Sequence, residues 1–216
     1  MHKRMLITSF ALAALAVAMP ALAGPPFICH PFEIGSANSL PWGALNNYLG
    51  MRDDYDFQHV VADTEMLLTP SMPTLVRMET LRRASIYASR DRAIAERLIA
   101  SVMRRVHAAD QSGQPDAQAL FDAGYVVEAL NELEQVGRYD KQFAGLDRLL
   151  AGLTKPFDAR PLIEKSAALR PGDASIELAL ALISRVPETE THLQKARLAA
   201  RQDALLANNL ARLQLQ

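Results

Sequence analysis

The chain has 216 residues, half of them hydrophobic, and its 23 Lys and Arg side chains are balanced by 24 Asp and Glu. A formal charge of −1 excludes the strongly basic surface of proteins that bind nucleic acids or anionic lipids, so no nucleic-acid partner is expected. The single cysteine, Cys29, excludes an intramolecular disulfide, so stability has to come from packing.

The first 23 residues have the layout of a secretory signal peptide. Met1–Arg4 is a basic head, residues 5–19 form an apolar run, and Pro20–Ala23 ends in the small residues that a signal peptidase reads. The run is shorter than the roughly 20 residues that a transmembrane helix needs. We therefore expect cleavage before Gly24, export to the periplasm or the medium, and no transmembrane segment after cleavage.

Residues 24–54 are predicted to form an irregular N-terminal arm. Pro and Gly are too frequent in this segment for a long helix. Phe27, Phe32, Leu40 and Trp42 nevertheless make it too apolar for a disordered tail. We expect the N-terminal arm to lie against the body of the protein, with Trp42 as its anchor.

Residues 55–216 have the hydrophobic periodicity of helices and are predicted to form one helical-repeat domain. Turn and N-cap residues divide this region, and no segment alternates like a β-strand between two turns. The fold class is therefore all-α. The predicted helices cover approximately residues 55–69, 74–88, 91–109, 116–137, 141–153, 158–169, 174–184 and 189–213.

The last two predicted helix pairs repeat at intervals of 30 to 33 residues, as stacked helix hairpins do. Residues 162–174 end a helix in Ala-Leu and continue in a Pro-containing turn, and this segment resembles the junction between tetratricopeptide repeats. Residues 120–125, where a Gly precedes a Tyr, look like the middle of a first repeat helix. The resemblance implies antiparallel hairpins stacked as a short solenoid that binds proteins without catalysis. The N-terminal arm is similar to that of uncharacterised exported bacterial proteins, which implies no particular activity.

Cys29 and His30 are the most suggestive candidate metal ligands. A thiolate and an imidazole are good ligands for copper or zinc, but adjacent residues rarely reach one ion together, so further ligands would be needed. A buried structural thiol is the alternative interpretation. His59 and Asp63 share a face of one predicted helix. Three interpretations of this pair are open: half of a metal site, a general-base pair, or only a solvent-facing ion pair or hydrogen bond.

Charge is distributed unevenly between two neighbouring segments. Residues 71–109 carry a formal charge of +5, and residues 110–137 carry −6. Two interpretations are open. Either neighbouring helices neutralise each other, or the basic segment presents a polar partner-binding face with Arg82 and Arg83 as contacts.

Sequence motifs of nucleophilic, zinc-protease and phosphate-binding sites are missing. The sequence therefore favours a non-catalytic, exported helical-repeat protein that binds another protein of the cell envelope, with no cofactor expected. A metal-binding envelope protein that uses Cys29 and His30 is the alternative. An enzyme whose catalytic residues form no recognisable motif is a further alternative.

Overall fold

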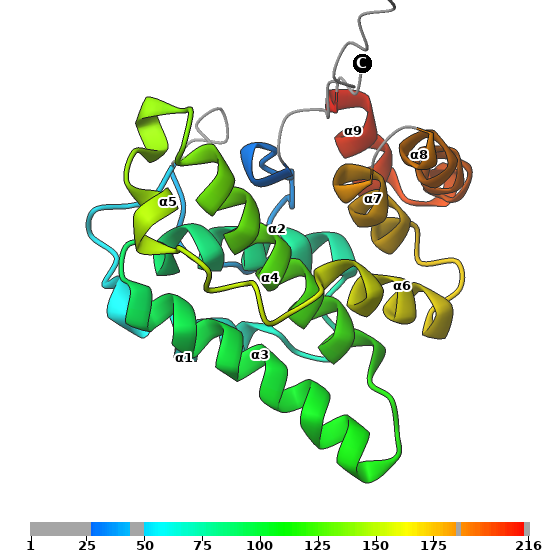
Figure 1. Ribbon diagram of the computed structural model, residues 1–216. Helices are drawn as coiled ribbons and strands as arrows, with labels where there is room; N and C mark the ends of the chain where they lie inside the picture. The colour runs from blue at the N-terminus through cyan, green and yellow to red at the C-terminus, as the bar shows by residue number, and fades with distance from the viewer. Residues whose placement is uncertain (1–26, 44–49, 185–186, 214–216) are drawn as a thin grey trace, which may run out of the picture.

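The computed structural model describes residues 27–43, 50–184 and 187–213, which form helices and loops without a β-strand (Figure 1). The all-α prediction is therefore confirmed for these residues, while the predicted signal peptide, 1–23, lies outside them. None of the described helices is both long enough and apolar enough to cross a membrane. The α-helices are α1 (Val60–Leu67), α2 (Thr74–Ala88), α3 (Arg92–Ser112), α4 (Ala117–Val136), α5 (Leu146–Leu149), α6 (Ala159–Leu169), α7 (Ala174–Ile183), α8 (Glu188–Ala199) and α9 (Ala204–Arg212). The short 3₁₀ turns are η1 (Phe27–Cys29), η2 (Phe57–His59), η3 (Lys141–Phe143) and η4 (Ala200–Gln202).

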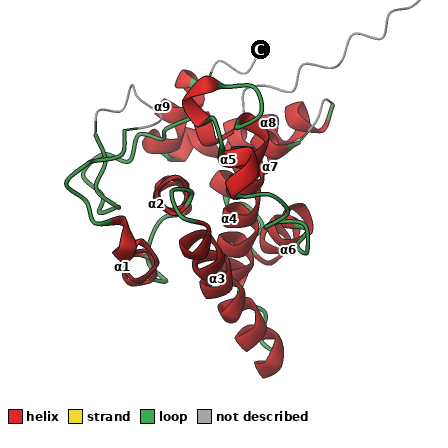
Figure 2. Cartoon of the chain, turned by 60° about the vertical axis from the view of Figure 1, so that its left-hand side comes forward, coloured by secondary structure: helices red, strands yellow, loops and turns green. Residues whose placement is uncertain are grey.

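Helix α2 lies at the centre of the fold. It contacts α1, α3, α4 and α7, and Figure 2 shows it nearly end-on among its neighbours. Every residue of α2 is buried, including four charged ones. Burial on all sides is unusual for a helix with so many polar residues, and it requires internal partners for each charge.

Helix α4 is the second central element and contacts α2, α3, α6 and α7. Gly124 lies at its closest approach to α6. A Cβ atom at this position would be 2.6 Å from Cγ1 of Ile163 and 2.8 Å from the carbonyl oxygen of Ala159. A residue without a side chain is therefore needed for α6 to pack against α4 at this distance.

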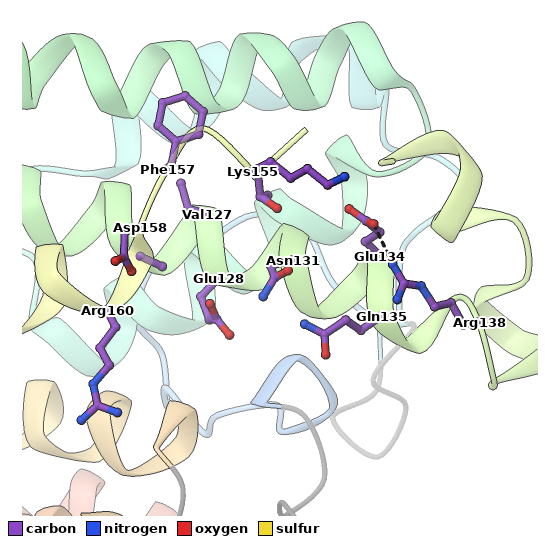
Figure 3. Close-up of a pocket in the computed structure, with 12 residues that line it drawn as sticks. Val127, Glu128, Asn131, Glu134, Gln135, Arg138, Lys155, Phe157, Asp158 and Arg160 are labelled. Carbon is purple, nitrogen blue, oxygen red and sulfur yellow. Dashed lines mark hydrogen bonds and ion pairs between the residues drawn. The ribbon is translucent and has the colours of Figure 1, made fainter. Parts of the chain in front are cut away.

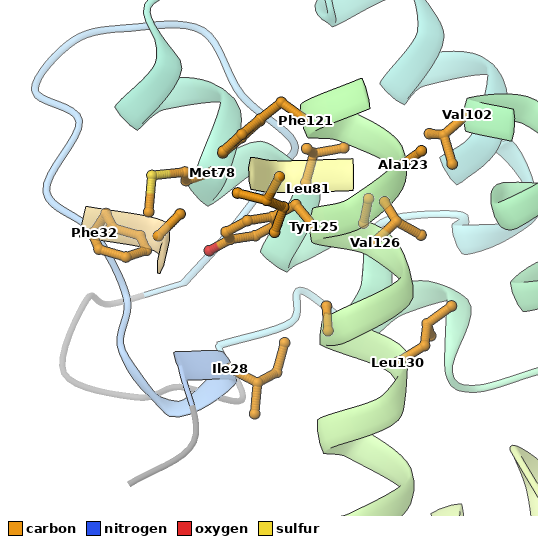
Figure 4. Packing of buried hydrophobic residues seen from close by; sticks show 14 of the residues in the cluster. Ile28, Phe32, Met78, Leu81, Val102, Phe121, Ala123, Tyr125, Val126 and Leu130 are labelled. Atoms are coloured by element: carbon orange, nitrogen blue, oxygen red, sulfur yellow. The ribbon is translucent and has the colours of Figure 1, made fainter. Parts of the chain in front are cut away.

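The hydrophobic core joins the N-terminal arm to the two central helices (Figure 4). Ile28 and Phe32 of the arm are at most 1 % exposed. They belong to the same buried cluster as Leu81 of α2 and Phe121 and Tyr125 of α4. The rings of Phe121 and Tyr125 are stacked, with centroids 5.5 Å apart. The arm therefore contributes to the core and does not merely cover it.

Two predicted helices differ from the observed structure. Residues 141–153 form only the short turns η3 and α5, because Gly145 and Gly152 adopt the left-handed conformation, with φ of 93° and 71°. The predicted last helix is interrupted at η4, and Asp203 then caps the separate helix α9. The prediction of continuous helices is wrong in both places.

Candidate functional site

Arg82 and Arg83, the predicted partner contacts, lie inside the protein. Their side chains are 0 % and 9 % exposed, and their Nε atoms lie 2.8 and 2.7 Å from the carboxylate oxygens of the buried Glu79. Arg82 also donates to the carbonyl oxygen of Ile28 (3.0 Å), and Arg83 donates to that of Leu40 (2.8 Å). Both guanidinium groups therefore hold the N-terminal arm, which covers the face that the sequence suggested for a partner.

Trp42 is half-buried where the N-terminal arm meets the end of α2. Its ring packs edge-to-face on Tyr87, with centroids 5.5 Å apart. The guanidinium carbons of Arg82 and Arg83 lie 5.1 and 5.7 Å from the Trp42 ring centroid, within cation–π range. The Tyr87 hydroxyl donates to the carbonyl oxygen of Pro41 at 2.7 Å. These contacts fix the arm around Trp42.

The basic and acidic segments neutralise each other between α2, α3 and α4. Asp122 of α4 is fully buried and pairs with Arg77 of α2 (2.7 Å) and Arg105 of α3 (2.5 Å). Arg105 also lies 3.7 Å from Asp116. Burial raises the pKa of Asp122, whereas the two arginines lower it. The interpretation of mutual neutralisation is confirmed at these positions.

Cys29 carries a free, half-buried thiol. Burial raises its pKa to about 11, the nearby Glu132 and Asp140 add to this effect, and Arg82 opposes it. The thiolate that would bind a metal is therefore disfavoured at neutral pH. Within the described part of the chain, no three His, Cys, Asp or Glu side chains are grouped to hold a metal ion, so the structure adds no further ligand to Cys29 and His30.

The structure does not pair His59 with Asp63. The Nε2 atom of the exposed His59 lies 3.4 Å from a carboxylate oxygen of Asp56. Asp63 instead accepts a hydrogen bond of 2.6 Å from the hydroxyl of Tyr55. The two residues therefore have separate structural contacts at the start of α1.

A polar pocket of about 440 Å³ opens between α4, the α5–α6 connection and the first turn of α6 (Figure 3). Glu128, Asn131 and Gln135 line it from α4, where their spacing of three and four residues places them on one face. Lys155 and Asp158 line it from the connection. Charged groups from segments separated in sequence thus converge on one open space.

Two basic residues that line this pocket are already bound to carboxylates. Arg138 lies 2.9 Å from Glu134. Arg160 lies 2.7 Å from Glu164 and 2.6 Å from Glu188. Each of these two guanidinium groups therefore already has an acidic partner.

Glu128 and Asp158 lack such a partner. Within the described residues, neither carboxylate forms an ion pair with a basic side chain. Burial raises the pKa of Glu128, a hydrogen bond with Asn131 lowers it, and the charge of Asp158 raises it. Asp158 occupies the N-cap position of α6, but its side chain makes no capping hydrogen bond. Asp158 is exposed to solvent, and the basic Lys155 lines the same pocket, so the charges of the lining are mixed.

The pocket lining combines three acidic, three basic and two amide side chains. Carboxylates, amides and basic groups that line one space can bind a polar ligand through hydrogen bonds and ion pairs. The described lining includes Thr154 but no Ser, Cys or His side chain that could act as a nucleophile or base beside Glu128. The geometry provides polar groups for recognition.

A second hollow of about 500 Å³ lies between α1 and α3. Its walls include the apolar side chains of Leu68, Leu98 and Val102. Its charged groups are engaged, since Glu65 and Arg104 form an ion pair of 2.8 Å across it. The hollow between α1 and α3 is therefore lined by fewer polar side chains than the pocket on α4.

Sequence reasoning did not single out Glu128 or Asp158. The available signal is that Glu128, Asn131 and Gln135 stand at helical spacing in the second half of α4. This spacing indicates one solvent-facing side of α4. It does not show that Asp158, thirty residues later, faces the same space.

Comparison of this sequence with protein-family models found no match, and the comparisons with curated proteins and with solved structures found none either.

Proposed function

We propose that this protein is an exported helical-repeat protein that binds another polypeptide in the cell envelope and does not catalyse a reaction. The pocket between α4 and α6 is the proposed recognition site. Export rests on the layout of residues 1–23, and the non-catalytic role rests on the missing sequence motifs and on the composition of the pocket lining.

The repeat interpretation has partial support in the packing of helices. α3 and α4 are joined by a short loop and pack against each other, as do α7 and α8. Gly124 provides the close approach that the resemblance to a first repeat helix implies. The contact between α2 and α7 departs from a solenoid, because there each repeat contacts only its neighbours. We propose tetratricopeptide-like hairpins that fold back into a more compact body.

The observation that carries the proposed function is the open pocket between α4 and α6, which charged and amide side chains line. Glu128 is half-buried, and burial raises its pKa, so a ligand that supplies a hydrogen-bond donor or a positive charge would stabilise its ionised form. The pocket lies at the surface between two helices, and this is a common position for binding sites in helical proteins.

Site-specific photo-crosslinking in cells tests this proposal. A photo-reactive amino acid at Gln135, an exposed residue of the pocket, should crosslink to a polypeptide partner. The matched control is the same amino acid at Gln114, which is also exposed but lies outside the pocket, in the α3–α4 loop. A crosslinked product specific to Gln135 supports the proposal. Equal products at both positions, or none at Gln135, would refute it.

Export has a separate test. N-terminal sequencing of the protein recovered from the cell envelope or the medium should begin at Gly24. Recovery of the uncleaved chain in the cytoplasm alone would contradict the localisation and leave the pocket-binding proposal standing.

A further inference from the structure

The body of the protein holds the N-terminal arm through the arm's backbone. The N–H of Ile28 donates to the carboxylate of Glu132 on α4 at 3.0 Å, and its carbonyl oxygen accepts from Arg82 on α2 at 3.0 Å. The N–H of Phe32 donates to Glu79 on α2, also at 3.0 Å. Recognition of backbone groups, with pockets for some of the side chains between them, is a common mode of peptide binding.

The same kind of contact recurs further along the arm. The carbonyl oxygen of Leu40 accepts from Arg83 on α2 at 2.8 Å. Glu33 exchanges two backbone hydrogen bonds with the side chain of Asn209 on α9, and its carboxylate lies 3.2 Å from Arg212. We call this surface of α2, α4 and α9 the arm groove. The side chains of the arm groove that bind the arm are Glu79, Arg82, Arg83, Glu132, Asn209 and Arg212.

The helices do not depend on the arm for their backbone hydrogen bonds. In the described part of the chain, no backbone–backbone hydrogen bond joins residues 27–43 to a helix. Release of the arm would break side-chain contacts and expose the apolar anchors Ile28, Phe32 and Leu40, which are at most 1 % exposed when docked (Figure 4). The arm is therefore a separable element that can open locally while the helices remain folded.

The face of α2 that the arm covers has the composition of a protein surface. Glu79 pairs with Arg82 and Arg83 under the arm, and Thr80 forms a hydrogen bond of 2.9 Å with Ser39 of the arm. Water can solvate these polar groups when the arm leaves, so opening costs less on this side than uncovering an apolar groove would. The exposed anchors of the arm favour its return to an intact arm groove.

We propose that the arm is exchanged between two copies of this protein: the arm of each chain docks in the arm groove of the other, and a reciprocal dimer results. A second copy fits because its arm carries the same anchors, and its Glu33 matches the charge of Arg212. The dimer keeps the arm contacts of the monomer, as in domain swapping, so high protein concentration favours it. The inference goes beyond the proposed function, because it concerns self-association through residues outside the pocket between α4 and α6.

Crosslinking in an isotope mixture tests the inference. Ordinary and ¹⁵N-labelled protein, each with a photo-reactive amino acid in place of Glu33, are mixed in equal amounts at high concentration in urea too dilute to unfold the body. After return to buffer, size-exclusion chromatography separates monomer from dimer before illumination. Crosslinks from position 33 to α9 should join chains of the same isotope in the monomer. In the dimer, mixed-isotope crosslinks should be as abundant as same-isotope crosslinks.

Two controls locate the exchange. The photo-reactive amino acid at Asp110, which is exposed and lies outside the arm and the arm groove, should give no mixed-isotope crosslink to α9. A synthetic peptide of residues 27–43, added in excess before the urea is removed, should lower the dimer fraction by at least about tenfold, because it fills open arm grooves. The same peptide with Phe32→Asp should have no effect, since a carboxylate does not replace a ring that is 1 % exposed.

The inference is overturned if no dimer forms, or if the dimer contains only same-isotope crosslinks between position 33 and α9. A dimer that forms equally well with the wild-type peptide present would also overturn it, because the contact between the copies would then lie elsewhere. The proposed function fails by a different result, the absence of a specific crosslink at Gln135, since the pocket between α4 and α6 shares no residue with the arm groove.

Discussion

Glu79→Gln is the most informative substitution in the core, because one carboxylate serves four donors. Its Oε1 atom accepts from Arg82 and Arg83, and its Oε2 atom accepts from Arg82 and from the backbone N–H of Phe32 in the N-terminal arm. Glutamine has the same shape but replaces one oxygen with an NH₂ group. In either orientation of the amide, two of the four hydrogen bonds become contacts between donors.

The expected loss of stability follows from these contacts. A hydrogen bond to a charged group contributes about 1.5–3 kcal/mol, and breaking a buried ion pair from one side costs about 3–5 kcal/mol. The substitution also removes the carboxylate charge that lies against the buried guanidinium groups of Arg82 and Arg83. We therefore expect the free energy of unfolding to fall by about 3–5 kcal/mol, which is a large share of the typical stability of a domain.

Urea unfolding followed by circular dichroism measures this change. With a slope of about 2 kcal/mol per molar urea, the midpoint should fall by roughly 1.5–2.5 M. Glu96→Gln is the matched control, because Glu96 pairs with Arg92 at 3.0 Å where the two side chains are 51 % and 45 % exposed. Its midpoint should change by about 0.3 M or less, since an exposed pair contributes little. Equal, small shifts for both variants would refute the role assigned to the buried carboxylate.

Three further substitutions or modifications test other contacts. Gly124→Ala should lower the free energy of unfolding by about 1–2 kcal/mol in urea unfolding, because the backbone carbonyl oxygen of Ala159 cannot move away from the new Cβ. A higher free energy of unfolding for the variant would show that the helix propensity of Ala outweighs this clash. The thiol of Cys29 should react with iodoacetamide at pH 8 about 100-fold more slowly in the native protein than in urea. The reason is that its pKa of about 11 in the folded protein is two units above the ordinary value of 9.0, so less thiolate is present. Equal rates would show that folding does not protect the thiol. Asp116→Ala removes the N-cap of α4 and should cost about 1 kcal/mol in thermal or urea unfolding, whereas Asp116→Asn should retain most of the cap.

Helix positions could largely be predicted where caps and periodicity agree. The predicted helix after Asp91 corresponds to α3, the one after Asp116 to α4, and the one after Asp158 to α6. Asp91 and Asp116 accept backbone hydrogen bonds as N-caps, so a local signal fixes the start of each helix. The prediction failed at 141–153, where glycines with positive φ override an apolar pattern that looks helical.

The polar side of α2 could not be interpreted correctly from its own sequence. Periodicity assigns charged residues to solvent, and Arg82 and Arg83 accordingly looked exposed. Their burial depends on contacts with Ile28 and Leu40, more than forty residues away in the chain. The pocket has the same difficulty, because residues of α4 and of the α5–α6 connection come to line one space only when α6 packs against α4 at Gly124. Each feature depends on tertiary contacts that local sequence patterns do not specify.

The bonds between Glu33 and Asn209 join the N-terminal arm to the last described helix. The backbone N–H of Glu33 donates to the Asn209 side chain at 2.7 Å, and the Asn209 amide returns a bond of 2.9 Å to the Glu33 carbonyl oxygen. Closing a loop this long carries a substantial entropic penalty, which favours late formation of this contact. Because the arm is synthesised before α9, the bonds that fasten it to α9 cannot form until the last described helix has been made.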